Sequence, residues 1–351
     1  MHQIQKMKKV LFFSSALFTL GFSSCLIREK VSSVNSSTAE IPSAIVMSYN
    51  VENLFDTIND PENDEDFLPS GKLKWNGQRY NEKLNHIAQV VNGVKIENGN
   101  RFPLVIGLIE VEHASCLNDL VSLSSLKDAH YQVAFIEGED ERGIDVGLLY
   151  NALELKVTSI SKFDIVLPDN DKTRHILEVI GNWNGQEIAF YVNHWPSRSG
   201  GTEKSAPLRL IASSTLEKAI QTRLQTNPNC KTIAMGDFND YPTDISLTNL
   251  DAIDGGATTV NMMRPLVNEK KGSHYYKGEW GFLDQFVVSG SLVDSIGSGL
   301  RASALETIAF DYMMYTNSKG EKSPARTYVG DAYKGGYSDH LPIQMELHLV
   351  K

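Results

Sequence analysis

Short apolar stretches rich in β-branched residues recur along the chain, and each ends abruptly at polar residues. Runs of this length and composition are typical of buried β-strands. The predicted strands lie at 44–48, 104–109, 144–150, 176–183, 187–192, 232–235, 283–288 and 343–349. Asn184 and Gly185 separate two of these runs, and this dipeptide favours the type I′ turn of a tight hairpin.

Two segments show helical rather than strand periodicity. Apolar positions recur every three or four residues over 80–91 and 206–224, which predicts two amphipathic helices. Strands and helices are interspersed without strict alternation, and the sequence shows no internal repeat. This order favours β-sheets packed face to face with helices outside them.

Composition narrows the class of protein. The chain has 351 residues, of which 41% are hydrophobic and 22% charged, values typical of a globular protein. Lys and Arg number 33 against 43 Asp and Glu, so the net charge of −10 argues against a strongly basic nucleic-acid scaffold. Three cysteines are too few for a disulfide framework or a four-thiolate zinc site. Cys116 and Cys230 could pair in an oxidising compartment, but nothing in their sequence context indicates it.

The first 25 residues have the features of an export signal. Lys6, Lys8 and Lys9 precede an apolar run over 10–22, and small residues follow it. The run is too short for a comfortable membrane span. Cys25 after two serines resembles the lipobox of bacterial lipoproteins, in which the cysteine is acylated and becomes the new N-terminus.

These features predict a signal peptide over 1–24, a tether rich in Ser, Thr and Asn over 25–42, and one folded domain over 43–351. Removal of three lysines with the signal changes the net charge from −10 to −13. We expect an exported protein that is anchored by a lipid on Cys25 to a bacterial cell-envelope membrane. The alternative is an ordinary signal peptide and a secreted or periplasmic protein.

The residues that end the apolar runs form a chemically restricted set of carboxylates, amides and imidazoles. They are Asn50, Glu110, His194, Asp237 with Asn239, Asp284, and Asp339 with His340. Each one alone is explained by a turn or a cap. Together they suggest one site, because rigid strand ends present functional side chains. Six acidic residues within 56–66 lack an EF-hand pattern, and we interpret that segment as a solvated loop.

This set suits hard divalent cations such as Mg²⁺ or Mn²⁺. The sequence has no His-Glu-x-x-His motif, no Gly-x-Ser-x-Gly elbow and no phosphate-binding Gly-rich loop with Lys-Ser/Thr. A zinc protease, a serine hydrolase and a P-loop enzyme are therefore disfavoured. The remaining enzyme class is one that hydrolyses a phosphate ester with one or two hard metal ions.

Six segments together resemble the motifs of the endonuclease/exonuclease/phosphatase superfamily, in order, over 43–351. The matching segments are 48–54 (SYNVENL), 106–111 (IGLIEV), 192–195 (VNHW), 235–240 (MGDFND), 282–286 (FLDQF) and 338–342 (SDHLP). The resemblance implies a catalytic domain with a four-layer α/β/β/α sandwich, in which two mixed sheets pack together between outer helices. It also implies a metal-dependent phosphoesterase that is similar to secreted deoxyribonucleases and abasic-site endonucleases.

We expect Glu110 to be the principal metal ligand, with Asn50 and Asp339 supplying further oxygens to Mg²⁺ or Mn²⁺. Glu112 competes with Glu110, because period-two alternation would place both on one strand face. A surface ion pair is the structural alternative for Glu110.

The resemblance implies that Asp237 orients or deprotonates the attacking water. Asn239 is expected to contact that water or a phosphate oxygen, unless the pair only builds an Asx turn. We expect His340 to hold a phosphate oxygen or move a proton, with Asp284 fixing its tautomer. His194 should be a second phosphate contact, unless it is a structural histidine.

Arg142 and Arg198 are expected to clamp the substrate phosphate, because guanidinium binds phosphate through paired donors. Both could equally be surface residues. The leading functional hypothesis is an endonuclease-like phosphodiesterase on DNA or RNA, with a basic groove near Arg198, Lys204 and Arg209. The alternatives are a phosphatase or phospholipase C-like esterase on sugar, inositol or lipid phosphates, and a binding protein without catalysis. We expect a monomer.

Overall fold

The computed structural model describes residues 41–60, 64–253, 256–269, 271–294 and 299–350. The predicted signal peptide and most of the tether lie outside these residues, as does Cys25. Within the described ranges, no helix is long and apolar enough to cross a membrane.

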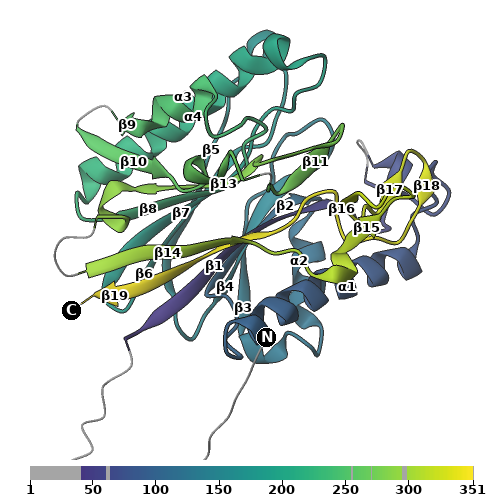
Figure 1. The fold of residues 1–351 in the computed structure, drawn as a ribbon, viewed down its shortest axis with the longest axis horizontal. Coiled ribbons are helices and arrows are strands. Elements are labelled where there is room, and N and C mark those ends of the chain that lie inside the picture. The colour runs from purple at the N-terminus through teal and green to yellow at the C-terminus, as the bar shows by residue number, and fades with distance from the viewer. Residues whose placement is uncertain (1–40, 61–63, 254–255, 270, 295–298, 351) are drawn as a thin grey trace, which may run out of the picture. The chain divides into compact units, whose positions relative to one another are not determined.

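Two mixed sheets form the centre of the fold (Figure 1). The first sheet has the order β14-β19-β1-β2-β4-β3, with β1 and β2 parallel and the other neighbours antiparallel. Its strands are β1 (Ser43–Leu54), β2 (Val105–Val111), β3 (Tyr131–Phe135), β4 (Asp145–Asn151), β14 (Gly299–Thr307) and β19 (Ile343–Val350).

The second sheet has the order β5-β6-β7-β8-β13-β10-β9, and β7 and β8 are its parallel pair. Its strands are β5 (Lys156–Phe163), β6 (Ile176–Trp183), β7 (Gln186–His194), β8 (Lys231–Asp237), β9 (Ala252–Ile253), β10 (Ala257–Asn261) and β13 (Asp284–Ser289). The predicted hairpin joins β6 to β7. Asn184 and Gly185 both have positive φ, as a type I′ turn requires.

Helices cover the outer face of each sheet. The helices are α1 (Gly77–Glu97), α2 (Ala114–Ser122), α3 (Thr202–Thr226) and the one-turn α4 (Ile245–Thr248). The two predicted helices correspond to α1 and α3 and extend beyond the predicted bounds. Asn76 caps α1, because its side-chain Oδ1 accepts hydrogen bonds from the backbone N–H groups of Gln78 and Arg79 at 3.1 and 3.2 Å.

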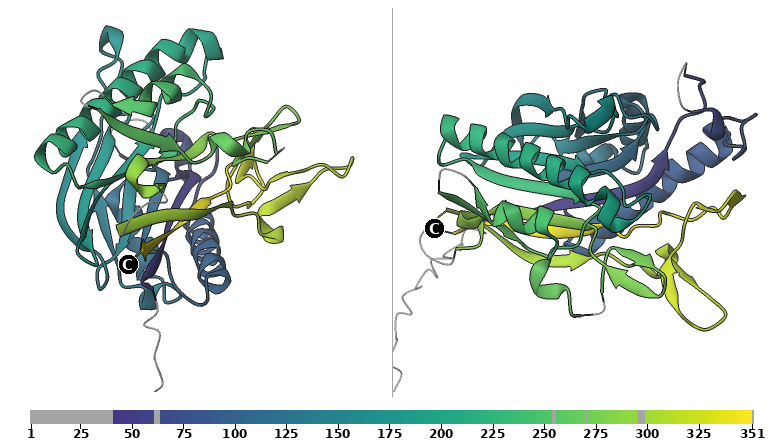
Figure 2. Two further views of the ribbon diagram at one scale, coloured as in Figure 1. Left: turned by 60° about the vertical axis from the view of Figure 1, so that its left-hand side comes forward. Right: turned by 90° about the horizontal axis from the view of Figure 1, so that it is seen from above.

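Three apolar clusters separate the four layers. One joins α1 and α2 to the first sheet, and another joins α3 and α4 to the second. The third lies between the sheets and includes Val46 and Val146 from the first and Phe190 and Met235 from the second. Figures 1 and 2 show α1 and α3 on opposite sides of the paired sheets. The α/β/β/α sandwich predicted from the sequence is therefore confirmed.

Cys116 and Cys230 are both buried and free, and they belong to the two outer clusters on opposite sides of the sheets. The layers therefore keep the two thiols apart, and the disulfide that the sequence left open does not form in this structure.

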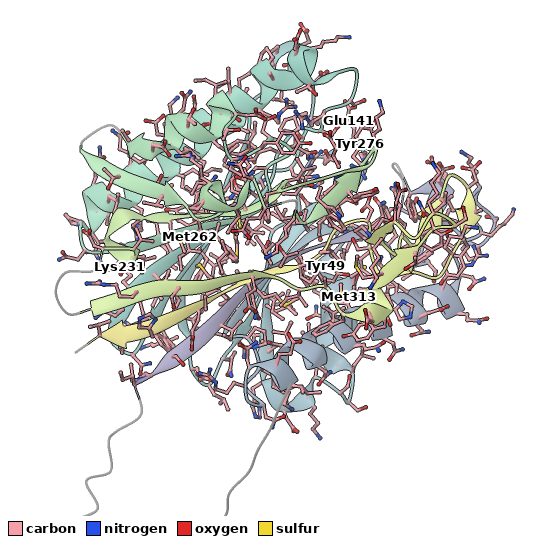
Figure 3. The ribbon with its side chains drawn as sticks, in the orientation of Figure 1. Tyr49, Glu141, Lys231, Met262, Tyr276 and Met313 are labelled. Atoms are coloured by element: carbon pink, nitrogen blue, oxygen red, sulfur yellow. The ribbon has the colours of Figure 1, made fainter. Side chains whose placement is uncertain are left out.

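Three small hairpins gather beyond one end of the sheets (Figure 1). They pair β11 (His274–Tyr276) with β12 (Glu279–Gly281), β15 (Met314–Thr316) with β16 (Lys322–Pro324), and β17 (Tyr328–Val329) with β18 (Ala332–Tyr333). Tyr276 projects near the outer end of β11 with 60% of its surface exposed (Figure 3). In the chain, β11 and β12 precede β13, which begins at Asp284, and the other two hairpins precede β19, just before Asp339 and His340.

Candidate active site

Strand pairing brings the polar strand ends of both sheets together. In the second sheet, His194 on β7 and Asp284 on β13 are each paired in register with Asp237 on β8. In the first sheet, Asn50 lies on β1 beside β2, which leads into Glu110. The Asn50 Nδ2 donates to Asp237 Oδ2 at 3.2 Å, and this bond joins the two sheets at the site.

Asp237 lies at the centre of this group. Its Oδ2 is 3.8 Å from the Nε2 atoms of both His194 and His340, and Glu110 Oε1 is 3.8 Å from His194 Nε2. Burial, together with Asp284 and Glu110, raises the Asp237 pKa to about 6, against the lowering effect of His340 and of the Asn239 N–H. The site thus holds several carboxylates that repel one another around Asp237.

The His340–Asp284 contact is the one predicted from the sequence. His340 Nδ1 is 2.6 Å from Asp284 Oδ2, and the aspartate is fully buried. Burial alone would lower the His340 pKa, but Asp284 and the neighbouring carboxylates raise it well above its usual value. His340 is therefore an imidazolium at neutral pH, with Nδ1–H donating to Asp284 and Nε2–H left to face Asp237.

His194 has the opposite charge state. Burial and then the nearby cations Arg174 and Arg142 lower its pKa well below the usual value, so it is neutral. Its Nδ1 is buried without a hydrogen-bond partner among the described residues. The site therefore combines one charged and one neutral imidazole on either side of Asp237.

Glu110 occupies a bulge at the end of β2. Its φ of 66° is left-handed, and the pairing of β2 with both neighbouring strands shifts at this point. Its Oε2 accepts the N–H of Asn53 at 3.1 Å, and 13% of the side chain remains exposed. The backbone thus turns this carboxylate toward His194.

The same bulge shows that the predicted shared face of Glu110 and Glu112 is wrong. Glu112 is buried, accepts the N–H of Asp56 at 2.7 Å and lies beside Cys116 under α2. Burial raises its pKa to about 7. A left-handed residue interrupts the period of two, so Glu112 does not compete for the same cation.

Asn239 follows the end of β8 in a left-handed conformation, with φ of 51°. Its N–H donates to Asp237 Oδ1 at 2.9 Å, and its side-chain Nδ2 donates to the Trp195 carbonyl at 3.0 Å. The Asx turn that the sequence offered as an alternative is therefore present. It also fixes Asn239 and Asp237 relative to each other.

The two predicted arginine clamps lie in different surroundings. Arg142 Nη2 is 3.7 Å from Glu110 Oε2 and donates to Asn53 Oδ1 at 2.8 Å, with 48% of its side chain exposed. Arg198 instead lies over the Tyr241 ring and 3.9 Å from Asp244. Only Arg142 is joined to the central group by these contacts.

The basic groove predicted near Arg198 loses one member. Arg209 is fully buried, and its Nε lies 2.6 Å from Asp240 Oδ1. An arginine held in this way is a structural ion pair and offers no charge to a polyanion at the surface.

Two polar groups of the site were not predicted. The His274 ring on β11 lies 4.8 Å from the His340 ring, and burial lowers the His274 pKa to about 4. Arg326 contacts both Asp339 and Glu52. Neither His274 nor Arg326 ends an apolar run, so the pattern that found the other residues could not find them. Glu52 stands two residues after Asn50, and that spacing was an available signal.

The donor set fits a hard divalent cation. Glu110 and Asp339 keep part of their side chains accessible, 13% and 20%, and Asn50 adds an amide oxygen. The raised Asp237 pKa reflects carboxylates that an added positive charge would stabilise. Among the described residues, ligand atoms lie within 4.8 Å of one another in three groupings: His274 with Asp339 and His340, Asp56 with Glu112 and Cys116, and Asp60 with Glu112 and His113.

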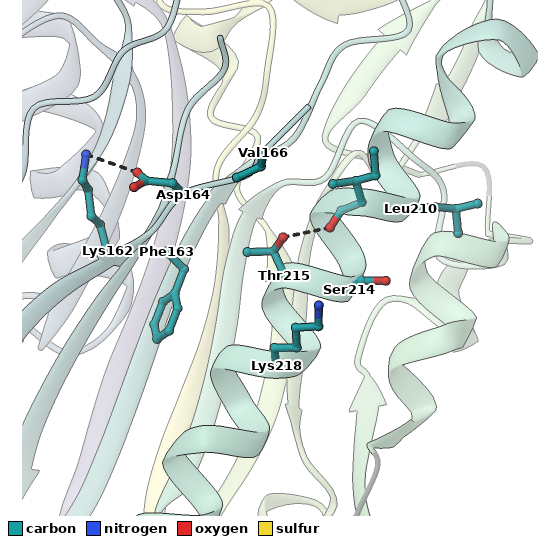
Figure 4. Close-up of a pocket in the computed structure, with 9 residues that line it drawn as sticks. Lys162, Phe163, Asp164, Val166, Leu210, Ser214, Thr215 and Lys218 are labelled. Atoms are coloured by element: carbon teal, nitrogen blue, oxygen red, sulfur yellow. Dashed lines mark hydrogen bonds and ion pairs between the residues drawn. The ribbon is translucent and has the colours of Figure 1, made fainter. Parts of the chain in front are cut away.

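A large surface pocket lies elsewhere. It measures about 680 Å³ between β5 and α3, and Figure 4 shows Lys162, Val166 and Lys218 among its lining residues. None of the strand-end residues lines it. The candidate active site is therefore located by the convergence of polar side chains and not by the size of a cavity.

Fold and site together define a hydrolase that acts on phosphate ester bonds. Residues 45–349 match the model of the endonuclease/exonuclease/phosphatase family, and the chain belongs to this family. Enzymes of the family generally use divalent metals. Comparison with curated proteins gives no match by sequence.

Solved structures show the same fold at low sequence identity. A family member from Bacteroides thetaiotaomicron is 16% identical with a TM-score of 0.54, covering 89% of this chain and 99% of that one. The mannosyl-6-phosphatase Bt3783 of the same organism is 14% identical with a TM-score of 0.53, covering 87% and 99%. TDP2 from D. rerio, complexed with a single-strand DNA product, is 13% identical with a TM-score of 0.53, covering 87% and 98%.

Proposed function

We propose that this protein is a divalent-metal-dependent phosphoesterase that hydrolyses a P–O bond by in-line attack of water. The arrangement around Asp237, with an imidazole Nε2 atom 3.8 Å away on two sides, carries the proposal. Glu110 and Asn50 would hold Mg²⁺ or Mn²⁺, with Asp339 as a further oxygen donor. The cation would neutralise charge on the phosphate and on the leaving oxygen.

The side chains have separate roles in this proposal. Asp237 orients the water and accepts its proton, because its Oδ2 faces the Nε2 atoms of His194 and His340. His340 donates its Nε2–H to a phosphate oxygen, while Asp284 holds the ring. Neutral His194 and the amide of Asn239 are further phosphate contacts.

Replacement of Glu110, Asp237 or His340 by Ala should each lower kcat/KM by about two to four orders of magnitude, because each removes a charge or a proton carrier. The assay is hydrolysis of p-nitrophenyl phosphate and its bis ester with Mg²⁺ or Mn²⁺ and with chelator. Arg101→Ala is the matched control, since Arg101 binds Ser43 at the far end of β1. Near-wild-type turnover in any of the three variants would contradict the role given to that residue.

The substrate has two candidates. The first is a phosphodiester of DNA or RNA, and the structural neighbour TDP2 was solved with a DNA product. The second is a sugar, inositol or lipid phosphate, and another neighbour is a mannosyl-6-phosphatase. The burial of Arg209 and the net charge of −10 favour the second, because binding of a polyanion depends on accessible basic residues.

Plasmid DNA, RNA and the two p-nitrophenyl esters separate these candidates. Cleavage restricted to DNA, RNA and the bis ester supports the first, and turnover of the monoester supports the second. If the protein hydrolyses none of the four substrates, the proposed function is contradicted.

We also propose export and lipid anchoring at Cys25 on the basis of residues 1–25. The protein should separate with the membrane fraction of a bacterial host and incorporate labelled palmitate. Cys25→Ser should abolish the label. A Cys25→Ser protein that is still labelled would contradict the anchor.

A further inference from the structure

Arg326 stands at the edge of the site with its guanidinium already fixed. Its Nη2 donates to Asp339 Oδ2 at 2.8 Å, and its Nε lies 3.3 Å from Glu52 Oε1. Half of the side chain, 51%, nevertheless remains exposed. A guanidinium has five N–H donors, and these two contacts leave the others available on the exposed side.

Buried groups support Arg326 from below. Glu52 is 6% exposed, and its other oxygen accepts the N–H of Thr327 at 2.6 Å. Lys83 is also buried, and its Nζ donates to Thr327 Oγ1 at 2.6 Å and to the Tyr337 carbonyl at 2.8 Å. Burial of a carboxylate costs several kcal/mol unless a cation and hydrogen bonds compensate it. The fold therefore places Glu52 where it holds Arg326 in one orientation.

Arg326 borders the reacting centre through Asp339. Ligand atoms of Asp339, His274 and His340 lie within 4.8 Å of one another. The Asp339 carboxylate thus contacts the Arg326 guanidinium and lies within reach of the His340 imidazole.

We propose that Arg326 is a substrate-binding residue that holds oxygens of the substrate phosphate on the Asp339 side, with Glu52 as its positioning residue. Arg142 acts in the same way on the Glu110 side. This inference rests on the proposed function. A guanidinium that is fixed before binding loses little rotamer freedom when the phosphate arrives, so its contacts contribute nearly their full energy to affinity.

The test measures phosphate affinity and kinetics on the same variants. Arg326→Ala should raise KM and the inhibition constant of inorganic phosphate about 10- to 100-fold, the range for loss of a charge-assisted hydrogen bond. Arg326→Lys keeps the charge without the paired donors and should recover part of this loss. Arg101→Ala is the control, since Arg101 is also half-exposed and paired with a glutamate.

Glu52→Gln tests the positioning role. It should weaken phosphate binding less than Arg326→Ala, and the two changes together should cost less than the sum of the single effects. A purely structural role for Glu52 would give additive effects and unchanged phosphate affinity. An inhibition constant within twofold of wild type in Arg326→Ala would overturn the proposal, provided circular dichroism shows a native fold; Arg326→Lys supplies the comparison if Arg326→Ala is unfolded.

Calorimetric titration of inorganic phosphate keeps this inference separate from the proposed function. Wild-type protein that binds phosphate but turns over no ester contradicts the proposed function, and the Arg326→Ala comparison still stands. Wild-type protein that hydrolyses esters, with phosphate binding that is unchanged in Arg326→Ala, overturns the role of Arg326 alone.

Discussion

At the scale of single residues, the protonation of His340 depends on the residue that contacts its Nδ1. Asp284 is fully buried and contacts His340 Nδ1, so in the proposed mechanism its effect on a substrate passes through the imidazole. The pair keeps His340 charged in a place where burial alone would remove the proton. A change at Asp284 should therefore affect the protonation of His340 more than it affects packing.

Asp284→Asn should lower the His340 pKa and reduce kcat by about two to four orders of magnitude, because the amide no longer stabilises the imidazolium. Histidine resonances followed by NMR against pH measure the pKa, and the acid-to-base profile of kcat should move with it. Asp251→Asn, in a partly exposed pair with Arg264, is the control. An unchanged His340 titration would contradict the orienting role.

Asp145, which lies outside the candidate active site, should make the stability of the fold depend on pH. It is 4% exposed, its Oδ2 accepts the Gly138 N–H at 2.6 Å, and its Oδ1 has no hydrogen-bond partner among the described residues. Burial raises its pKa to about 7, with Glu137 and Asp140 adding to the effect. The folded-state pKa lies above the unfolded one, so this contribution to stability is full at low pH and is lost as pH rises through 7.

Asp145→Asn removes that dependence. At pH 8 the variant should gain on the order of 1–3 kcal/mol of unfolding free energy relative to wild type, and near pH 4 the gain should vanish. Denaturant unfolding at the two pH values measures the difference. Equal offsets at both pH values would show that Asp145 is not a buried acid with a raised pKa.

At the scale of elements, eight of the strands in the two sheets and the two long helices were predictable, because each carries a run with a clear period. The remaining sheet strands, β3, β5, β9, β10 and β14, and the helix α2 were not predicted. The hairpins β11–β12 and β17–β18 were not predicted either, since strands of two or three residues show no period. His274 and Arg326 lie in or beside these hairpins. The turn of Glu110 away from the face of Glu112 was also missed, because a bulge leaves no mark in an apolar pattern.

At Gly236 the backbone conformation and the close approach of β7 to β8 together require glycine. Its φ is 131°, and an added Cβ would lie 2.0 Å from the Asn193 carbonyl oxygen on the neighbouring strand β7. Gly236→Ala should separate β7 from β8 at the step that places His194 beside Asp237. We expect a loss of stability of about 2–4 kcal/mol or more and a fall in activity.

Gly185→Ala is the matched change, because Gly185 also has positive φ but its added Cβ meets nothing within 4 Å. It should cost about 1–2 kcal/mol and leave kcat unchanged. Thermal unfolding and ester hydrolysis on both variants make the comparison. Similar losses in the two would show that contact with Asn193 is not what requires glycine at 236.

At the scale of the whole domain, the site lies where two sheets meet, and each sheet supplies part of it. Asn50 and Glu110 come from the first sheet, and His194, Asp237 and Asp284 from the second. The Cβ of an alanine at Gly107 on β2 would lie 3.3 Å from Met235 on β8, so the sheets pack closely just below the site. The sequence indicated which polar residues lie next to apolar runs, but Asp284 begins β13 and Asp339 and His340 precede β19, so these three do not end strands as expected. It could not show which faces pack together, because that depends on contacts between distant segments.

A cation bound between the sheets should therefore stabilise the whole domain. Ligands that bind only the folded state add RT ln(1 + [L]/Kd), about 2.7 kcal/mol at one hundred times Kd. Mg²⁺ or Mn²⁺ should raise the melting temperature of the chelator-treated protein. Glu110→Gln should lose this shift, because it removes the charged ligand, while Arg101→Ala should retain it. If Glu110→Gln shows the full shift, the cation that stabilises the fold binds elsewhere, and the assignment of Glu110 as its principal ligand is wrong.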